Sequence, residues 1–561
     1  MKNNMRLLVV GGVAGGASAA VRARRLSENA EIIIFERGPF VSFANCGLPY
    51  RVGNVIKKED DLLVATPELF KGWFNIEVRT HSNVCLVDRK RQEIEIENRT
   101  TDTVYRERYD ALVLAPGAAP IKPPVEGIDL PGIFTIRSIP DSRVVMDWID
   151  RKNIRHAAIV GGGFIGLEMT ENLKHLGLDV TLIEMLPQVM STMDPEMAVL
   201  IHDHLISKGV TLCLGSPVTG FRQDKNGRIA VLTAADKTIS TDIVILALGV
   251  RPEIELAQEA GLTIGDLGGI QVDQRMQTSD ARIWAVGDAV EVKNAITAQP
   301  GLVPLAGPAN RQGRIAADNI VGVEPHDHLF RGVQATAVCG VLGLTIASTG
   351  ITEKQLRRLP DNQIDRDYEK IYLHPSHHAN YYPDAKSIAL KLIFSTPEGR
   401  ILGAQAVGLA GVEKRIDVIA MAIQKRGTVF DLEEAELCYA PQYGSAKDPV
   451  NHAGMIASNI LRGHLEIAHW DQLSSADHFI LDVRTTREFK NGHVENAVNI
   501  PLHQLRQRIG EVPFDRDIWV YCLFGQRSYF AMRILSQNGY RARNLSGGFL
   551  TFKAFNKVKA G

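Results

Sequence analysis

Residues 156–184 read HAAIVGGGFIGLEMTENLKHLGLDVTLIE, and this stretch decides the fold of the chain. The apolar run before Gly161 predicts a buried strand, the glycine-rich turn predicts a phosphate-binding loop, and the segment after it predicts a helix. Gly161, Gly163 and Gly166 stand at the spacing that allows a tight turn, close approach of a pyrophosphate and close packing of helix on strand. Glu184 ends the second strand, where a carboxylate can bind a ribose diol.

The same pattern occurs at the beginning of the chain, in MRLLVVGGVAGGASAAVRARRLSENAEIIIFE, residues 5–36. It comprises a strand, a glycine turn, a helix and a second strand. That second strand ends at Glu36, the counterpart of Glu184. Val13 stands where the middle glycine is usual, but neighbouring glycines can still supply the close approach. The alternative for both acids is a strand-end charge that faces solvent. Two such units in one chain are a more specific signal than one, and they predict two dinucleotide-binding α/β domains.

A single cysteine, Cys46, lies in VSFANCGLPY shortly after the first unit. The other five cysteines lie far from it in sequence, so no cysteine pair is available here to store electrons. A lone thiolate beside a redox cofactor has to cycle through a sulfenic acid, a persulfide or a mixed disulfide. The alternative is a buried, inert cysteine. The polar neighbours Ser42 and Asn45 favour a reactive site.

Composition excludes several classes of protein. The 561 residues carry a formal net charge of −1, so we expect neither a nucleic-acid nor a membrane partner. Six cysteines in so long a chain do not form a disulfide framework, which favours a reducing compartment, the cytoplasm. No apolar run reaches transmembrane length, and the first strand and glycine turn account for the faint likeness of the N-terminus to a signal peptide.

Two further segments carry polar residues at the ends of apolar strands. In RIWAVGDAVEV, Gly287 and Asp288 follow a strand, and we expect Asp288 at the head of a helix, where it can bind a ribityl chain. In DIWVYCLFGQRSYF, a strand delivers Cys522 to the start of a helix whose amides can surround a thiolate or a persulfide. Arg527 closes that loop after four intervening residues, a length that suits sulfur better than phosphate.

The chain as a whole resembles the fusions of coenzyme A-disulfide reductase with a rhodanese domain, which belong to the single-cysteine flavoprotein disulfide reductases. SFANCGLPY carries the resemblance in the first part, and HFILDVRTTREFKNGHVENAVNIP with the Cys522 loop carries it in the last. It implies an FAD-binding domain (1–120 and 250–325), an NAD-binding domain (121–249), an α+β dimerisation domain of short β segments and two helices (326–455) and a rhodanese α/β domain (465–561).

The resemblance also implies residues of a coenzyme A channel and a homodimer. Tyr381 and Tyr439 match two tyrosines that reach the cysteine from the partner subunit, although either alone could serve packing. Arg22 and Arg25 lie three residues apart on one basic helix, which suits an adenosine phosphate, unless this face is simply solvated. Ser18 and Lys447 are assigned to the same channel. The first helix lacks the histidine expected of the related peroxidases.

We therefore expect NADH to drive, through FAD, the reduction of coenzyme A persulfide, polysulfide or coenzyme A disulfide at Cys46, while Cys522 handles sulfane sulfur. An NADH peroxidase or oxidase with a sulfenic acid at Cys46 stays open, as does a sulfurtransferase with a regulatory flavin part. A rhodanese domain that serves only for docking is a further alternative. The residues assigned to cofactor binding are Gly11, Gly12, Val13, Ala14, Gly15, Glu36, Arg37, Ser42, Asn45, Gly161, Gly163, Phe164, Ile165, Gly166, Glu184, Gly287 and Asp288. No metal site is expected.

Overall fold

The computed structural model describes residues 5–225, 227–235, 237–322, 328–359, 367–473 and 478–560. The expected domain limit at 325/326 lies outside these residues, as do both chain ends. Contacts divide the chain into two compact units, Met1–Met185 with Ser216–Val333, and Leu186–Gly215 with Gln334–Gly561. No helix in the described ranges is both long and apolar enough to cross a membrane.

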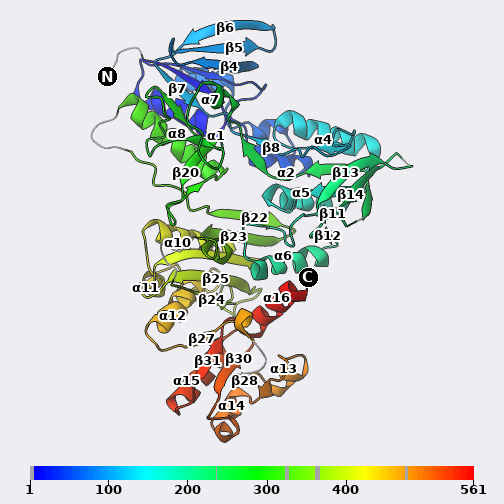
Figure 1. Cartoon of the computed structure of the whole chain (residues 1–561), viewed down its shortest axis with the longest axis vertical. Coiled ribbons are helices and arrows are strands. Elements are labelled where there is room, and N and C mark those ends of the chain that lie inside the picture. The colour runs from blue at the N-terminus through cyan, green and yellow to red at the C-terminus, as the bar shows by residue number, and fades with distance from the viewer. Residues whose placement is uncertain are drawn as a thin grey trace. The chain divides into compact units, whose positions relative to one another are not determined.

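The first unit contains the two expected dinucleotide folds (Figure 1). One parallel sheet runs in the order β19 (Ile283–Ala285), β7 (Ala111–Leu114), β1 (Arg6–Val10), β2 (Glu31–Phe35) and β3 (Glu77–Arg79). The other includes β11 (Asp179–Ile183), β10 (His156–Val160), β16 (Ile243–Leu246) and β9 (Ile133–Phe134). Each glycine turn therefore opens beside the central strands of a parallel sheet, as the sequence predicts.

Helices cover these sheets, and smaller sheets extend them. The helices are α1 (Ala14–Leu26), α2 (Leu48–Val52), α3 (Pro67–Phe74), α4 (Ile139–Lys152), α5 (Phe164–His175), α7 (Glu255–Glu259) and α8 (Ala306–Val321). The smaller sheets consist of β4 (Ser82–Asp88), β5 (Glu93–Asn98) and β6 (Thr103–Arg108); β13 (Val218–Gln223), β14 (Ile229–Thr233) and β15 (Thr238–Thr241); β8 (Ala118–Pro120) and β17 (Val250–Pro252); and β18 (Ile270–Gln271), β20 (Val290–Lys293) and β21 (Pro300–Gly301).

Helix α1 lies against α8 at a distance that only glycine permits (Figure 1). A Cβ on Gly313 would lie 2.2 Å from the carbonyl oxygen of Gly15, and one on Gly16 would lie 1.9 Å from that of Gly11. Both distances are far below any real carbon–oxygen contact, so these positions require glycine. The N-terminus of α1 is thereby fixed directly over the end of β1.

The second unit combines an antiparallel sheet with a parallel one. The antiparallel sheet runs β22 (Ala337–Val341), β23 (Leu344–Gly350), β26 (Ile401–Gly408), β25 (Ile388–Ser395) and β24 (Tyr368–Leu373). Two long helices, α10 (Val412–Gln424) and α12 (Pro449–Leu461), accompany it as expected, and the shorter α9 (Glu353–Leu356) and α11 (Val429–Glu434) are additional. Residues 186–215 contribute α6 (Pro195–Ser207) and β12 (Thr211–Cys213).

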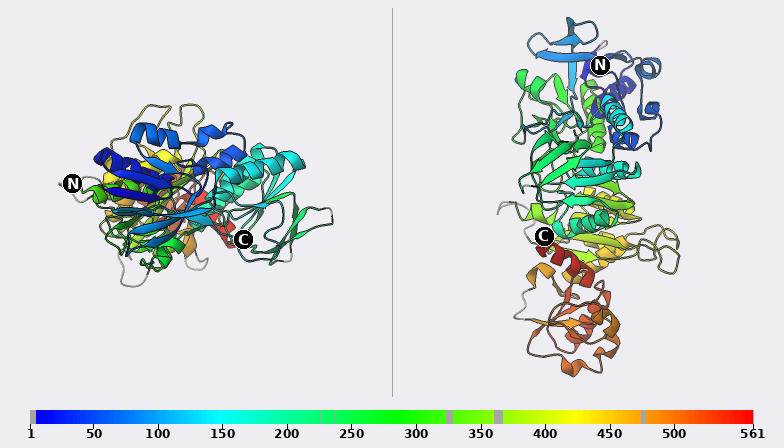
Figure 2. Two further views of the ribbon diagram at one scale, coloured as in Figure 1. Left: turned by 90° about the horizontal axis from the view of Figure 1, so that it is seen from above. Right: turned by 90° about the vertical axis from the view of Figure 1, so that its right-hand side faces the viewer.

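The parallel sheet of this unit is the expected C-terminal α/β domain. Its order is β27 (Ile467–Ala468), β31 (Ala542–Leu545), β30 (Asp517–Tyr521), β28 (His478–Asp482) and β29 (Val498–Asn499). Its helices are α13 (Thr486–Lys490), α14 (Leu502–Leu505), α15 (Gln526–Gln537) and α16 (Gly548–Ala560). Figure 2 shows α16 beside α6, where the side chains of Lys557 and Asp203 pair at 2.5 Å.

A buried cluster of charges joins the separate segments of the second unit. The ammonium group of Lys391, with a side chain that is 0% exposed, lies 2.8 Å from Asp194, 2.6 Å from Glu196 and 2.8 Å from Glu353. Burial by itself would lower the pKa of Lys391, but these three carboxylates raise it above its ordinary value. Because Lys370 bridges Glu353 to Asp471, the cluster also reaches the C-terminal domain.

We expect Lys391→Met to lower the free energy of unfolding by about 3–5 kcal/mol, because it leaves three buried carboxylates without their shared cation. Lys425→Met, at an exposed position after α10, is the matched control and should change stability by about 0.5 kcal/mol or less. Chemical denaturation followed by circular dichroism measures both. Equal stability of the two variants would contradict the ionic account of this cluster.

Candidate active sites

The first glycine turn presents helix amides toward an open end of the sheet. Gly11 has a φ of +92°, and a Cβ there would lie 2.1 Å from the carbonyl oxygen of Ala115. In the described structure, no side chain caps α1 at Val13, and its first turn contains no acid. Glu36 accepts hydrogen bonds from the amides of Gly12 (3.0 Å) and Gly38 (2.9 Å), which hold its carboxylate beside the turn. These features fit the pyrophosphate and ribose of a dinucleotide.

The second glycine turn repeats this arrangement. Glu184 accepts a hydrogen bond of 2.7 Å from the amide of Gly162. A Cβ on Gly166 would lie 1.9 Å from the carbonyl oxygen of Gly161, whereas a Cβ on Gly163 would meet nothing within 4 Å. Gly166 is therefore required for packing, and the space beside Gly163 can admit a ligand. Within the described chain, α5 also begins without a side-chain cap or an acid in its first turn.

The Cys46 segment is attached to the first glycine turn by the backbone. Ser42 has a φ of +47°, and its amide donates a 2.8 Å hydrogen bond to the carbonyl oxygen of Gly12. The carbonyl oxygen of Ser42 in turn accepts from the amide of Val64 at 2.8 Å. Cys46 then lies in the short helical turn Asn45–Gly47, directly before α2. The thiol is exposed, in contrast to the buried, inert alternative.

Two carboxylates act on the Cys46 thiol from other parts of the same unit. Burial on one side raises the pKa of Cys46, and the charges of Glu168 and Asp288 raise it further. Glu168 lies on α5, and burial followed by the charge of Glu171 raises its own pKa to about 7. Charged residues from both dinucleotide folds therefore influence the thiol electrostatically. The thiol form of Cys46 is favoured in this environment, so a thiolate needs a proton acceptor or an added positive charge.

Asp288 is not at the head of a helix, and the sequence-based expectation on this point is wrong. It lies in a turn between β19 and β20, because the residues that follow it form a strand. Burial raises the pKa of Asp288, and no hydrogen bond from the described residues reaches its carboxylate. Gly287 has a φ of +87°, and its amide donates 2.8 Å to Gln312 on α8. The Asp288 carboxylate can therefore accept hydrogen bonds from the hydroxyl groups of a ribityl chain.

The basic helix α1 is less open than its sequence suggests. Arg24 is 5% exposed, and its guanidinium donates to backbone carbonyls of neighbouring loops, so it serves the fold. Arg22 pairs with the buried Asp318 on α8 at 2.5 Å, whereas Arg25 is exposed. Ser18 contacts Asn310, also on α8. The predicted phosphate site thus holds one exposed arginine and one that already has an anionic partner.

Arg37, assigned to the cofactor by sequence, pairs with Glu253 at 2.6 Å. That carboxylate also binds Arg137. Asn45 is exposed beside Cys46. These contacts do not test the cofactor-binding roles of Arg37 and Asn45, which stay predictions.

The structure brings Tyr381 and Tyr439 together in the second unit. Their hydroxyl oxygens lie 2.7 Å apart, although the residues are 58 positions apart in sequence. The hydrogen bond to Tyr439 raises the pKa of Tyr381. Both side chains are exposed, Tyr381 at 74%, and Cys438 and Lys447 are exposed in the same loop region. An exposed pair of phenols suits a role toward a ligand or a second subunit.

Cys522 lies at the bottom of a cup formed by its loop. Strand β30 ends at Tyr521, and Gly525, with a φ of +101°, is the N-cap residue directly before α15. The amide of Gly525 donates to the sulfur at 3.1 Å, and the hydroxyl of Ser528 lies 3.4 Å from it. The thiol is 1% exposed. These donors suit a sulfur anion, as expected for this loop.

Arg527 stands at the rim of the cup and is held by Glu488. Its two terminal nitrogens donate to the two carboxylate oxygens of Glu488 at 2.8 and 2.6 Å. That hydrogen bonding is the main reason that the pKa of Glu488 falls to about 2. The charge of Arg527 is thus matched by a fixed negative charge.

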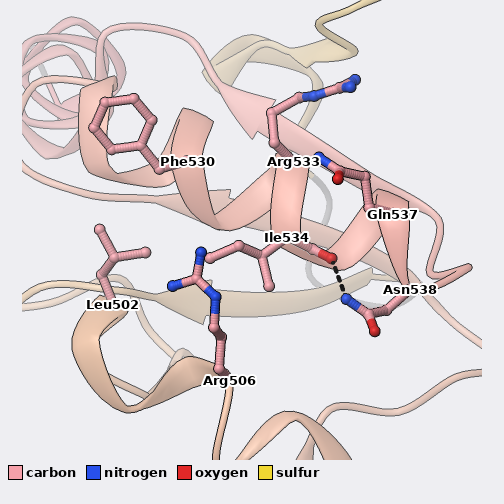
Figure 3. A pocket seen from close by; sticks show the side chains of 7 residues that line it. All are labelled: Leu502, Arg506, Phe530, Arg533, Ile534, Gln537 and Asn538. Carbon is pink, nitrogen blue, oxygen red and sulfur yellow. Dashed lines mark hydrogen bonds between the residues drawn. The ribbon is translucent and has the colours of Figure 1, made fainter.

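A hollow of about 470 Å³ lies on the same domain between α14 and α15 (Figure 3). Phe530 and Ile534 on α15 and Leu502 on α14 line it, with Arg506 and Arg533 among its polar residues. Cys522 is not among the lining residues. The hollow is therefore separate from the cup.

Two residues of these sites were not predicted from sequence. Glu168 follows the last glycine of the second fingerprint by two positions, which is the only local sign of its role. Glu488 sits in the pattern Thr485-Thr-Arg-Glu488, which signals a helix cap. Neither pattern shows which distant side chain the acid faces.

Comparison with known families agrees with this division of the chain. The pyridine nucleotide-disulphide oxidoreductase profile matches residues 5–310, the dimerisation-domain profile of that family matches 336–448, and the rhodanese-like domain profile matches 468–555. The expected fold class, with two dinucleotide domains, a dimerisation domain and a rhodanese domain, is confirmed.

Among curated relatives, the NADH oxidase of Methanocaldococcus jannaschii is 37% identical over 80% of this chain and 98% of its own length. The coenzyme A disulfide reductase of Staphylococcus haemolyticus is 34% identical over 81% and 100%.

Two solved structures cover both parts of the chain. The reduced CoADR-RHD of Bacillus anthracis has a TM-score of 0.94 and 45% identity over 98% of both chains. The NAD-dependent persulfide reductase from A. fulgidus has a TM-score of 0.89 and 37% identity, over 98% of this chain and 100% of its own. The family profile at residues 5–310 and these full-length similarities show that the chain belongs to the pyridine nucleotide-disulphide oxidoreductase family.

Proposed function

We propose that this chain is an NADH-driven reductase of coenzyme A persulfide, polysulfide or coenzyme A disulfide, with Cys46 as the attacking thiol. The observation that carries the proposal is one exposed thiol, whose segment is joined to a dinucleotide turn by the hydrogen bond from Ser42 to Gly12. Cys85, the other cysteine of that unit, lies on β4 and contacts Glu95 instead. A lone thiol of this kind suits a mixed-disulfide cycle.

The similar proteins support this substrate class. One relative is named a coenzyme A disulfide reductase, and a structure that covers nearly the whole chain is titled an NAD-dependent persulfide reductase. The rhodanese-like domain favours substrates that carry sulfane sulfur over plain coenzyme A disulfide.

The cofactors are FAD on the first glycine turn and NADH on the second. When bound, FAD supplies two-electron transfer between the nicotinamide and the thiol. The chain's part is to anchor the two nucleotides through the amides of α1 and α5, through Glu36 and Glu184, and to offer Asp288 as an acceptor. The FAD-binding domain then comprises residues 1–120 and 250–325, and the NAD-binding domain residues 121–249.

The bond changes at Cys46 balance with two electrons per turnover. The thiolate attacks one sulfur of coenzyme A disulfide, so that a mixed disulfide forms and one coenzyme A thiolate leaves. With a coenzyme A persulfide, the leaving group is hydrosulfide. Two electrons from NADH then break the mixed disulfide and restore both thiolates.

Cys522 would accept sulfane sulfur as a persulfide in its cup. A dimer in which Tyr381 and Tyr439 reach the cysteine of the partner subunit would complete the reductase site, and Ser18, Arg22, Arg25 and Lys447 would bind the phosphates of coenzyme A. The dimerisation-domain match supports the homodimer. No disulfide bond joins the cysteines of the described structure, which fits a reducing compartment such as the cytoplasm.

An NADH oxidase is the second candidate, and the name of the M. jannaschii relative favours it. It would use the same thiol through a sulfenic acid, with oxygen or peroxide in place of a sulfur substrate. The first helix contains no histidine near its glycine turn, and the rhodanese-like domain has no role in that reaction. We therefore place it below the sulfur reductase.

Cys46→Ser should purify yellow with FAD but lose persulfide-dependent NADH oxidation by at least about a thousandfold, because a hydroxyl cannot replace the attacking thiolate. The assay is anaerobic NADH oxidation with coenzyme A disulfide, coenzyme A persulfide and polysulfide, with parallel oxygen and peroxide arms. Cys85→Ser is the matched control and should keep full activity. Undiminished persulfide turnover by Cys46→Ser would refute the mechanism, and faster turnover of oxygen or peroxide by the wild type would favour the oxidase.

NADH should exceed NADPH by at least about tenfold in kcat/KM, since Glu184 can bind a ribose diol but repels a 2′-phosphate. Glu184→Gln should narrow this ratio, and Asp179→Asn, which removes an exposed acid at the start of β11, should leave it unchanged. Comparable kcat/KM values for the two cofactors in the wild type would show that Glu184 does not decide the preference.

Subunit mixing tests the shared site. Neither Cys46→Ser nor the double variant Tyr381→Phe/Tyr439→Phe should be active alone, but a heterodimer of the two contains one site without either change. Random exchange of equal amounts makes about half of the dimers heterodimers, so activity should rise toward about a quarter of wild type. No recovery after exchange proven by mass spectrometry would mean that the tyrosines do not serve the partner's cysteine.

A further inference from the structure

We propose that Glu488 determines the sulfur donor of the Cys522 cup: by cancelling the charge of Arg527, it disfavours the dianion thiosulfate and favours persulfides. The inference rests on the proposed role of Cys522 as a sulfur acceptor. It concerns the rim of the cup, where Arg527 and Glu488 face each other with side chains 33% and 29% exposed.

The pair is held in a fixed geometry. Arg527 binds both oxygens of Glu488, and one of these oxygens also accepts from the amide of Thr485 at 3.0 Å and from its hydroxyl at 2.9 Å. The carboxylate therefore has four donors and cannot swing away from the rim without losing the cap of α13. Planar pairing through two hydrogen bonds also directs the guanidinium toward Glu488.

The electrostatic consequence follows from the position of Arg527 between two anions. Hydrogen bonding to Glu488 is the main reason that the pKa of Arg527 is raised, and the charge of Cys522 and a hydrogen bond to it raise the pKa further, so the same guanidinium acts on the sulfur and on the rim carboxylate. The ionised Glu488 leaves the rim with no net charge. Inside the cup, the amide of Gly525 and the hydroxyl of Ser528 also donate to the sulfur.

The two donor classes differ in the charge that they bring to this rim. Thiosulfate has two negative charges next to the transferred sulfur: Cys–S⁻ and S₂O₃²⁻ give Cys–S–S⁻ and SO₃²⁻. A persulfide has at most one negative charge next to the transferred sulfur, because the phosphates of coenzyme A persulfide lie at the far end of its pantetheine arm: Cys–S⁻ and R–S–S⁻ give Cys–S–S⁻ and R–S⁻. A rim without net positive charge attracts the thiosulfate dianion only weakly, whereas an arginine without a carboxylate partner would attract it strongly.

Glu488→Gln separates the charge from the structural role of Glu488. Glutamine can still serve the helix cap at this position, so α13 is retained while the negative charge is lost. Thr485→Ala is the matched control, because it weakens the cap and leaves the charge. Arg527→Gln is a second variant, in which the cation itself is removed.

The test measures sulfur transfer to cyanide by the full-length protein, as thiocyanate formed from thiosulfate and from coenzyme A persulfide. Glu488→Gln should raise the ratio of kcat/KM for thiosulfate to that for persulfide at least about tenfold, Thr485→Ala should leave it unchanged, and Arg527→Gln should lower it. An unchanged ratio in an active Glu488→Gln protein would overturn this inference alone. Transfer that persists in Cys522→Ser would instead refute the proposed role of Cys522.

Discussion

The first unit depends on a backbone contact that only glycine allows. Helix α1 begins so close to β1 that a Cβ on Gly16 would overlap the carbonyl oxygen of Gly11, and α8 packs just as closely on Gly15 through Gly313. This packing directs the amides of the helix toward the open end of the sheet. The Cys46 segment is then bonded to the same turn through Ser42, so the nucleotide site and the thiol are placed by one constraint.

A buried cluster of charges helps to join the segments of the second unit. Lys391 binds acids from α9 and from residues 186–215, and Lys370 extends the cluster to Asp471 of the C-terminal domain. Breaking a buried cluster of this kind is costly, because the remaining charges stay in an apolar interior. At the Cys522 cup, by contrast, the pair Arg527–Glu488 is partly exposed, so its charge balance can act on a ligand.

Local patterns in the sequence predict the architecture well. Both βαβ units, the Cys46 turn and the strand that delivers Cys522 follow from short motifs, because glycine spacing and strand–turn–helix order are local properties. The helix expected at Asp288 is wrong, since the alternating residues after it form β20. Glu168, Glu488 and the Lys391 cluster escape prediction because their partners lie in other elements. The pairing of Arg22 with Asp318 depends in the same way on how α1 meets α8.

The central claim is that substrate sulfur is bonded to Cys46 during turnover. Mass spectrometry of the peptide that contains Cys46 tests it directly, after anaerobic reaction of the enzyme with one equivalent of coenzyme A disulfide. We expect a coenzyme A adduct on Cys46 that disappears when one equivalent of NADH is added. A Cys46 that stays unmodified while the enzyme still reduces the disulfide would contradict it.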